Sequence, residues 1–159
     1  MKIAVYPGSF DPITNGHLDV LIRSSKVFDK VVVLVAINPH KQGRFSIEER
    51  IEMIKSAVKD IKNVEVDSYE GLTVDYAKKI GAKHLIRGLR AVSDFEYEFQ
   101  LNSANKFACS DIDMIFFMSS TNNSFINSST IIEMSEAGID VSSLVPSLVN
   151  EKLIERNKK

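Results

Sequence analysis

The sequence has one cysteine, Cys109, no tryptophan and only four prolines among its 159 residues. A single cysteine cannot form an intramolecular disulfide, which excludes a small fold held together by disulfides and makes a reducing compartment, the cytoplasm, the expected location. The three histidines, His17, His40 and His84, show no zinc-ligand spacing with this cysteine. A structural metal site is therefore not expected.

Long apolar runs and an excess of charge of one sign are also absent. The longest apolar run, residues 31–37, has seven residues, whereas roughly 18 or more are needed to span a bilayer. Residues 1–12 have no apolar core or small-residue cleavage site, so a secretory signal is not expected. Twenty basic against twenty-one acidic residues give a net charge of −1. This balance offers no general attraction for nucleic acid or an anionic membrane, so any anion-binding site must be local.

What the chain contains is typical of one globular domain. Its residues are 44% hydrophobic and 26% charged, close to globular averages. Its 159 residues fall within the usual single-domain range of about 100–200. We therefore expect residues 1–159 to form a single domain.

Short β-rich runs alternate with helical patterns along the whole chain. The second run is apolar at every position, as in a central strand of a parallel sheet covered on both faces. Alternation at this spacing predicts an α/β fold, a Rossmann-like doubly wound sheet of about five parallel strands with helices on both faces. The expected strands cover residues 3–6, 31–37, 64–66, 84–86 and 114–118.

Two expected helix starts carry the S-x-x-E spacing of a capping box, in which the two side chains bond each other's backbone N–H groups. Ser46 and Glu49 precede a run with apolar residues on one face, and Ser93 and Glu96 repeat the spacing. The apolar stripe predicted for the second of these helices consists of Tyr97, Leu101, Ala104 and Ala108.

The segment after the first strand, residues 6–17, has features of a phosphate-binding loop. Gly8 would let the backbone approach an anion, and Gly16 would let His17 enter the first turn of a helix, where free N–H groups attract anions. A helix N-terminus disfavours imidazolium, so a neutral His17 would be a good donor to a charged oxygen. The alternative is an Asn15-Gly16 turn followed by an exposed histidine.

Basic side chains follow two more strands at the same edge of the expected sheet. Lys41 lies in the loop after the second strand, and Arg87 and Arg90 follow the fourth. Arginine forks suit phosphate oxygens. The alternatives are that Lys41 is an ordinary solvated charge and that the arginines form surface ion pairs with the acidic residues at 94, 96 and 98.

A polar segment, residues 119–130, follows the fifth strand and runs into a helix start at Ser128. Ten of its twelve residues are Ser, Thr or Asn, so hydroxyls, amides and free backbone N–H groups converge there. The P-loop, G-x-G-x-x-G and G-x-S-x-G signatures are all absent. Anion-binding groups at several strand ends without an obvious nucleophile favour reaction by positioning and charge stabilisation, as in phosphoryl or nucleotidyl transfer.

Residues 8–12 followed by Thr14-Asn15-Gly16-His17 resemble the T-x-G-H form of the H-x-G-H signature of the nucleotidyltransferase superfamily. That element alone also fits cytidylyltransferases and the nicotinate or nicotinamide mononucleotide adenylyltransferases. Residues 38–41, 86–90 and 94–98 narrow the resemblance to the bacterial phosphopantetheine adenylyltransferases, and it extends over the whole chain.

The resemblance implies transfer of AMP from ATP to 4'-phosphopantetheine, giving dephospho-coenzyme A and pyrophosphate in coenzyme A biosynthesis. It also implies magnesium (Mg2+) as cofactor, with unknown protein ligands, and a cytoplasmic homohexamer, and it leaves coenzyme A open as a further ligand. His17, Lys41 and Arg90 would be catalytic, with His17 stabilising the transition state. The residues implied to bind phosphopantetheine are Ser9, Lys41, Thr73 and Arg87. Those implied to bind ATP are Ser9, Phe10, His17, Gly88, Leu89, Arg90, Glu98, Asn123, Ser124, Phe125, Ile126, Asn127, Ser128 and Ser129.

Three positions depart from the family pattern. Ser9 stands where threonine is also common and keeps the hydroxyl. Asn127 replaces a serine, and Ile132 stands where relatives often have a basic residue. We therefore expect the last helix start to hold a triphosphate less securely than the segment around His17.

Two other functions stay open. One is a regulatory nucleotide-binding module of the same fold, since a fold does not fix a function; the other is a nucleotidyltransferase with another phosphate-bearing acceptor. Thr14 and the loop of residues 87–90 favour phosphopantetheine as acceptor. The presence of His17 and Lys41 together with two arginines favours catalysis, because binding alone would not require all four.

Overall fold

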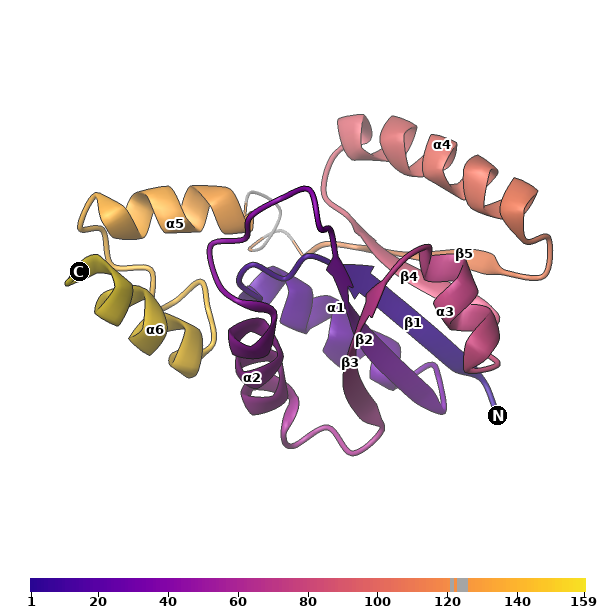
Figure 1. The fold of residues 1–159 in the computed structure, drawn as a ribbon, viewed down its shortest axis with the longest axis horizontal. Helices are drawn as coiled ribbons and strands as arrows, with labels where there is room; N and C mark the ends of the chain where they lie inside the picture. The colour runs from indigo at the N-terminus through magenta and orange to yellow at the C-terminus, as the bar shows by residue number, and fades with distance from the viewer. Residues whose placement is uncertain (121, 123–125) are drawn as a thin grey trace.

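The computed structural model describes residues 1–120, 122 and 126–159, and for residues 92 and 93 the backbone only. Its centre is the expected parallel sheet, five strands in the order β3-β2-β1-β4-β5 (Figure 1). The strands are β1 (Ile3–Gly8), β2 (Lys30–Ile37), β3 (Val64–Glu70), β4 (His84–Leu89) and β5 (Asp113–Met118). The helices are α1 (Asn15–Ser25), α2 (Ile47–Val58), α3 (Thr73–Lys79), α4 (Val92–Ala108), α5 (Ser128–Glu136) and α6 (Ser147–Asn157). Among the described helices, none is both long and apolar enough to cross a membrane.

Three strands extend further toward their carboxyl ends than the apolar pattern predicts. β1 continues through Pro7 and Gly8, β3 through Asp67 and Ser68, and β4 through Arg87 and Gly88. These polar or small residues break the apolar pattern, but their backbones pair with the neighbouring strand, for example Asp67 with Leu34. Backbone pairing therefore extends the strands to the edge where the expected functional loops begin.

The central strand, β1, and its neighbour β4 are paired with each other over only part of their length. β1 and β4 share the register pairs Ala4↔His84 and Val5↔Leu85, whereas β1 pairs with β2 from Ile3 to Gly8. Beyond Val5, β1 and β4 are therefore no longer in register with each other at the carboxyl edge. This is also the place where the strand order reverses direction.

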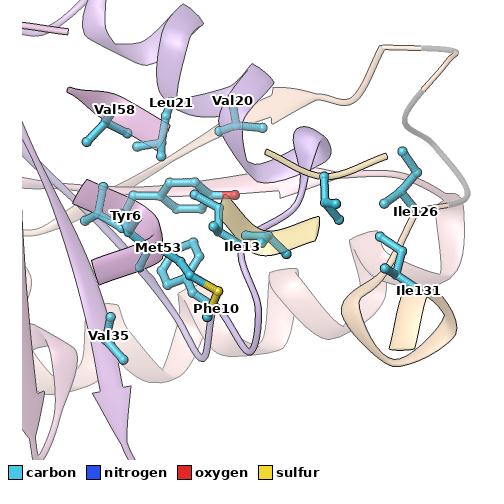
Figure 2. Packing of buried hydrophobic residues seen from close by; sticks show 14 of the residues in the cluster. Tyr6, Phe10, Ile13, Val20, Leu21, Val35, Met53, Val58, Ile126 and Ile131 are labelled. Carbon is cyan, nitrogen blue, oxygen red and sulfur yellow. The ribbon is translucent and has the colours of Figure 1, made fainter. Parts of the chain in front are cut away.

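Helices cover both faces of the sheet, as expected (Figure 1). One face forms a large apolar cluster with side chains of α1, α2, α5 and α6, and the other forms a smaller cluster with side chains of α3 and α4. In the large cluster, Phe10 and Ile13 of the β1–α1 loop are buried beside Tyr6 and Met53 (Figure 2). The loop that carries the predicted phosphate-binding residues is therefore anchored in the core.

The capping box predicted at Ser46 is confirmed. The Oγ atom of Ser46 accepts a hydrogen bond from the backbone N–H of Glu49 at 3.1 Å, and the Glu49 carboxylate accepts one from the Ser46 N–H at 2.9 Å. The second predicted capping box is wrong, because α4 begins at Val92 with Ala91 as its N-cap and no side-chain cap. Ser93 is already inside the helix, two positions after the N-cap, and so is too late to cap it.

The apolar stripe predicted for α4 is also wrong. Tyr97 is 63% exposed, Leu101 is only partly buried, and Ala104 and Ala108 are exposed. The buried residue among the described side chains of α4 is instead a charged one, Glu98. The rotation of α4 about its own axis is thus set by an ion pair as well as by apolar packing. A hydrophobic pattern cannot reveal the contribution of the ion pair.

Candidate active site

A pocket of about 480 Å³ opens where β1 and β4 separate at the carboxyl edge of the sheet. Ligands of doubly wound sheets bind at this switch point. The wall comes from β1 and the loop after it, the start of α1, the end of β4, α4 and the start of α5. The lining residues are Tyr6, Pro7, Gly8, Ser9, Phe10, Thr14, Gly16, His17, Val20, Arg87, Gly88, Arg90, Asp94, Tyr97, Glu98, Ser119, Ile126, Asn127, Ser128 and Ser129.

Most of the site residues expected from the sequence meet in this pocket. Those that line it are Ser9, Phe10, His17, Arg87, Gly88, Arg90, Glu98, Ile126, Asn127, Ser128 and Ser129. Leu89, Lys41 and Thr73 are not part of its lining: Leu89 ends β4, and the other two follow β2 and β3 at the same edge of the sheet. Asn123, Ser124 and Phe125 lie outside the described residues.

His17 is held at the start of α1 by a capping box with Thr14. The Oγ1 atom of Thr14 accepts from the His17 backbone N–H at 3.3 Å, and the Nδ1 atom of His17 accepts from the Thr14 backbone N–H at 3.0 Å. Because Nδ1 accepts a backbone proton, the neutral ring carries its own proton on Nε2. The geometry therefore fixes Nε2 as the hydrogen-bond donor of this ring.

The charge state of His17 follows from its surroundings. Burial, with the positive charges of Arg90 and Arg87 as the next causes, lowers the pKa of His17 from 6.5 to about 4. The ring is therefore neutral at pH 7, as expected for a histidine in the first turn of a helix. The neutral ring can donate its Nε2–H in a hydrogen bond to an anionic oxygen. It lacks the second proton of an imidazolium, so it cannot act as a general acid near neutral pH.

Two aromatic rings support the His17 ring. Phe10 is 1% exposed, and its ring meets that of His17 at 5.0 Å in an edge-to-face contact. Tyr6 contacts Phe10 in the same way at 5.3 Å. Gly8 makes room for this cluster, because a Cβ atom there would lie 3.0 Å from the Phe10 ring. Phe10 thus contributes to the pocket wall mainly by packing against the His17 ring.

Arg87 is oriented by a buried carboxylate. Its Nε atom lies 3.0 Å from both oxygens of Glu98, its Nη2 atom donates to Oε1 at 2.6 Å, and its Nη1 atom donates to the carbonyl of Pro7 at 3.3 Å. Burial opposes the charge on Arg87, but the hydrogen bond and charge of Glu98 outweigh it and raise the pKa of the guanidinium. Both Glu98 oxygens are engaged by Arg87, so Glu98 fixes a permanent cation in the pocket wall.

Arg90 joins the β4–α4 loop to the start of α5. Its Nη1 atom donates to the carbonyl of Ile126 at 3.0 Å, and its Nε atom lies 3.5 Å from the carboxylate of Asp94. That carboxylate also accepts from the Arg90 backbone N–H at 3.1 Å. Arg90 therefore lies between two walls of the pocket with part of its guanidinium still open to a ligand.

The start of α5 shows how the chain accommodates its departures from the family pattern. Asn127 is the N-cap, and its side-chain oxygen accepts from the Thr130 backbone N–H at 2.8 Å. Asparagine and serine cap helices about equally well, so this substitution keeps the helix start intact. Ile132 is 2% exposed in the large core cluster, so this position brings no charge to the pocket.

Two serines of α5 connect the pocket to neighbouring loops. The Oγ atom of Ser128 donates to the carbonyl of Pro12 at 2.7 Å. The Oγ atom of Ser129 accepts from the Arg44 guanidinium at 3.3 Å. Within the described part of the chain, the backbone N–H groups of both serines have no acceptor, as is usual in a first helical turn. These N–H groups can bind an anionic oxygen at the pocket mouth.

Several lining residues were not expected from the sequence. Val20 and Tyr97 are examples, and Tyr6, Asp94 and Ser119 lie in segments noted in the sequence but received no site role of their own. Burial raises the pKa of Tyr6 well above its usual range, so its hydroxyl stays protonated and can donate in the pocket. The position of Tyr6 near the end of a strand before Pro7-Gly8 is a usable signal, whereas Tyr97 depends on the rotation of α4, which the sequence pattern misplaced.

The pocket does not provide a metal cage. No group of three or more His, Cys, Asp or Glu side chains within the described ranges could hold a metal ion. The pocket carboxylates, Asp94 and Glu98, already face Arg90 and Arg87. These residues do not fit a resident metal site.

Residues 5–134 match the Cytidylyltransferase-like family. The chain is 49% identical to the phosphopantetheine adenylyltransferase of Caldanaerobacter subterraneus subsp. tengcongensis over 159 residues, which covers 100% of this chain and 99% of that protein. It is 51% identical to the phosphopantetheine adenylyltransferase of Clostridium botulinum over 158 residues, 99% of each chain. Its fold is similar to that of a candidate nicotinate-nucleotide adenylyltransferase from Vibrio parahaemolyticus, with a TM-score of 0.76, 21% identity and coverage of 99% and 94%.

Proposed function

The chain belongs to the phosphopantetheine adenylyltransferases of the cytidylyltransferase-like family, and we propose on this basis that it transfers the adenylyl group of ATP to 4'-phosphopantetheine. The products are dephospho-coenzyme A and pyrophosphate. A phosphate oxygen of the acceptor forms a bond to the α-phosphorus, and the bond from that phosphorus to the oxygen bridging to the β-phosphate breaks. Pyrophosphate leaves with that bonding pair, and no covalent enzyme intermediate is needed.

One observation carries this proposal: a neutral His17 with its proton on Nε2 lines the same pocket as two arginines. Among the described residues, no hydrogen bond occupies Nε2. The ring can therefore donate to an oxygen of the α-phosphate, where charge shifts as the phosphorus becomes five-coordinate. Arg90 is placed to stabilise the same group of oxygens.

The reaction does not require a general base. A phosphate monoester has a second pKa of about 6 and is largely dianionic at pH 7, so the attacking oxygen has no proton to lose. This agrees with His17, whose Nδ1 atom is engaged by the helix cap and whose pKa of about 4 makes it a weak base. Catalysis would then come from positioning and electrostatic stabilisation.

We assign the acceptor phosphate to Arg87, Lys41, Ser9 and Thr73. Arg87 is a permanent cation at the gap between β1 and β4. Lys41 is exposed, and its ammonium makes no ion pair with any described residue. An unpaired cation on the loop after β2 can therefore turn toward a phosphate that enters at the carboxyl edge.

Magnesium is proposed to accompany ATP rather than to reside on the protein. Magnesium keeps several waters and is commonly held through substrate phosphates with one or two carboxylates. Because the described pocket carboxylates face arginines, the phosphates of the nucleotide would supply the main ligands.

We also propose that the chain forms a homohexamer in the cytoplasm. The supporting feature is a set of exposed apolar side chains on α4 and at the end of β5: Phe95, Phe99, Phe107 and Met118 are 52%, 59%, 96% and 74% exposed. Exposed apolar surface of this kind is typical of contacts between proteins. Sedimentation equilibrium of the purified protein measures the assembly mass directly, and a monomeric mass contradicts this proposal.

The test of the activity is pyrophosphate release from the purified protein with ATP, magnesium and 4'-phosphopantetheine, with the acceptor omitted as control. We expect release that depends on the acceptor, together with a product of the mass of dephospho-coenzyme A. ATP binding without turnover would favour a regulatory module. Turnover with another phosphate-bearing compound but not with 4'-phosphopantetheine would show that this other compound is the acceptor.

A further inference from the structure

A nearly buried ion pair lies behind the pocket and is not part of its lining. The Nε atom of Arg50, on α2, lies 3.3 Å from Oδ1 of Asp11, in the β1–α1 loop, and the two side chains are 8% and 13% exposed. Charged side chains are rarely buried unless they are paired and hydrogen-bonded. This pair is therefore a specific structural device rather than an incidental surface contact.

Asp11 binds the end of the β2–α2 loop, residues 38–46. Its Oδ2 atom accepts from the Arg44 backbone N–H at 2.8 Å, and its Oδ1 atom accepts from the Phe45 backbone N–H at 2.9 Å. A carboxylate with two backbone donors and a guanidinium is fixed in orientation. The loop after β1 and the loop after β2 are thus joined through one side chain.

Arg50 also joins the β1–α1 loop to the β2–α2 loop, through backbone carbonyl groups. Its Nε atom donates to the carbonyl of Phe45 at 2.9 Å, and its Nη1 atom donates to the carbonyl of Ser9, in the pocket wall, at 3.3 Å. Gly43 leaves room for this guanidinium, because a Cβ atom there would lie 1.5 Å from Nη2 of Arg50. A lysine at position 50 would keep the charge but could not bridge both carbonyls with a planar fork.

The two loops depend on this pair to different degrees. The β1–α1 loop is also held by Phe10 and Ile13, which are 1% and 0% exposed, and by Ser128, which donates to the Pro12 carbonyl. Toward the described part of the chain, residues 38–43 make only local bonds, such as the Lys41 N–H to the Asn38 carbonyl at 3.2 Å, whereas the following two residues are also held by Ser129, by Arg156 and by the burial of the Phe45 ring. Loss of the pair would therefore release mainly the segment that carries Lys41.

We propose that Asp11 and Arg50 are positioning residues that hold the Lys41-bearing loop at the pocket and so set the affinity for the phosphate-bearing acceptor. The inference rests on the proposed function, which assigns Lys41 to the acceptor. Because the pair acts through Lys41, disrupting the pair should have no effect on the reaction once the charge of Lys41 has been removed by substitution.

The test is a double-mutant cycle with Arg50→Lys and Lys41→Ala, in which KM is measured for 4'-phosphopantetheine and for ATP. Arg50→Lys alone is expected to raise the acceptor KM about 10-fold and to change the ATP KM less than about 2-fold. In the Lys41→Ala background, Arg50→Lys is expected to change the acceptor KM less than about 2-fold. An equal effect in both backgrounds, or equal effects on both substrates, overturns the proposal.

A second variant and a control guard against a simple loss of folding. Gly43→Ala should displace the Arg50 guanidinium without altering either member of the pair, and is expected to give the same change in KM. Glu52→Gln removes the Glu52–Lys152 ion pair between α2 and α6 and should leave both KM values unchanged. If Gly43→Ala behaves like Glu52→Gln, the proposal is wrong.

Hydrogen exchange of the Arg44 and Phe45 amides separates this proposal from the proposed function. Without any substrate, both amides should exchange faster in Arg50→Lys than in the wild type, because their acceptor loses its partner. Unchanged exchange overturns the positioning role whatever the reaction is. Faster exchange in a protein that does not adenylate phosphopantetheine supports the hold on the loop and places the failure in the proposed function.

Discussion

The Nδ1 atom of His17 accepts a hydrogen bond from the backbone N–H of Thr14 at 3.0 Å. In most capping boxes a glutamate or glutamine makes this contact from the third helical position. Here the residue that completes the helix start is an imidazole, and the contact decides which of its nitrogens carries the proton. The stability of α1 and the chemistry of the pocket therefore share one side chain.

His17→Ala should lower kcat by roughly 10²–10³, because one hydrogen-bond donor to the transition state is lost. ATP affinity, measured by calorimetry, should change much less. Glu49→Ala is the matched control, since it removes the same third-position capping contact from α2 without touching the pocket. A folded His17→Ala enzyme with nearly normal kcat would show that His17 does not stabilise the transition state.

The lowered pKa of His17 predicts a specific pH dependence. Its value falls from 6.5 to about 4 on folding, so the unfolded chain takes up the proton first as the pH decreases. The stability contributed by the neutral ring is fully present above about pH 6.5 and is lost as the pH falls toward about 4. In an NMR titration, the Cε1–H signal of His17 should stay constant from about pH 8 to 5 and shift only near pH 4. A midpoint near 6.5 would contradict the proposed neutral donor.

Glu98→Gln should impair use of the acceptor. The amide keeps the shape of the side chain but removes the negative charge that fixes Arg87, so kcat/KM for 4'-phosphopantetheine should fall about 10-fold or more. Glu96→Gln, an exposed change on the same helix, serves as control and should have little effect. Equal behaviour of the two variants would mean that the ion pair with Arg87 does not matter for the reaction.

Asn127→Ala should destabilise the protein by about 1 kcal/mol, because α5 loses the acceptor for the Thr130 N–H. Asn127→Ser should restore most of this stability, since serine caps helices about as well as asparagine. Urea denaturation of the three proteins measures both differences. If the alanine variant is as stable as the wild type, the cap contact contributes nothing measurable.

The sheet and part of the pocket follow from local features of the sequence, whereas several other lining residues were expected only because of the family resemblance. The uninterrupted apolar run at 31–37 predicts a central strand, and Ser46 with Glu49 predicts the start of α2. His17 could be placed in a first helical turn because Gly16 directly precedes it, although the cap that Thr14 provides was not expected from the sequence. Each of these inferences uses residues within a few positions of one another, where backbone geometry is decided locally.

The features that could not be predicted depend on contacts between distant residues. The sequence offers ion pairs of the two arginines with the acidic residues at 94, 96 and 98 as an alternative, but it does not show that Glu98 is buried against Arg87 and so sets the rotation of α4. The link between Asp11 and Arg50 joins positions 39 residues apart (50 minus 11), and neither residue belongs to a recognisable pair in the sequence. Such charged contacts become visible only once the chain has folded around them.

The limited pairing of β1 with β4 has a mechanical consequence. The pocket begins where the pairing of these two strands ends, so the two strands form its floor. Each of them is paired on its other side, β1 with β2 and β4 with β5. A floor of this kind cannot widen or narrow unless the whole sheet changes its twist. We therefore expect the enzyme to adjust to its two substrates through the side chains and loops at the rim of the pocket. The distance between β1 and β4 at the base of the pocket should stay the same whichever ligand is bound.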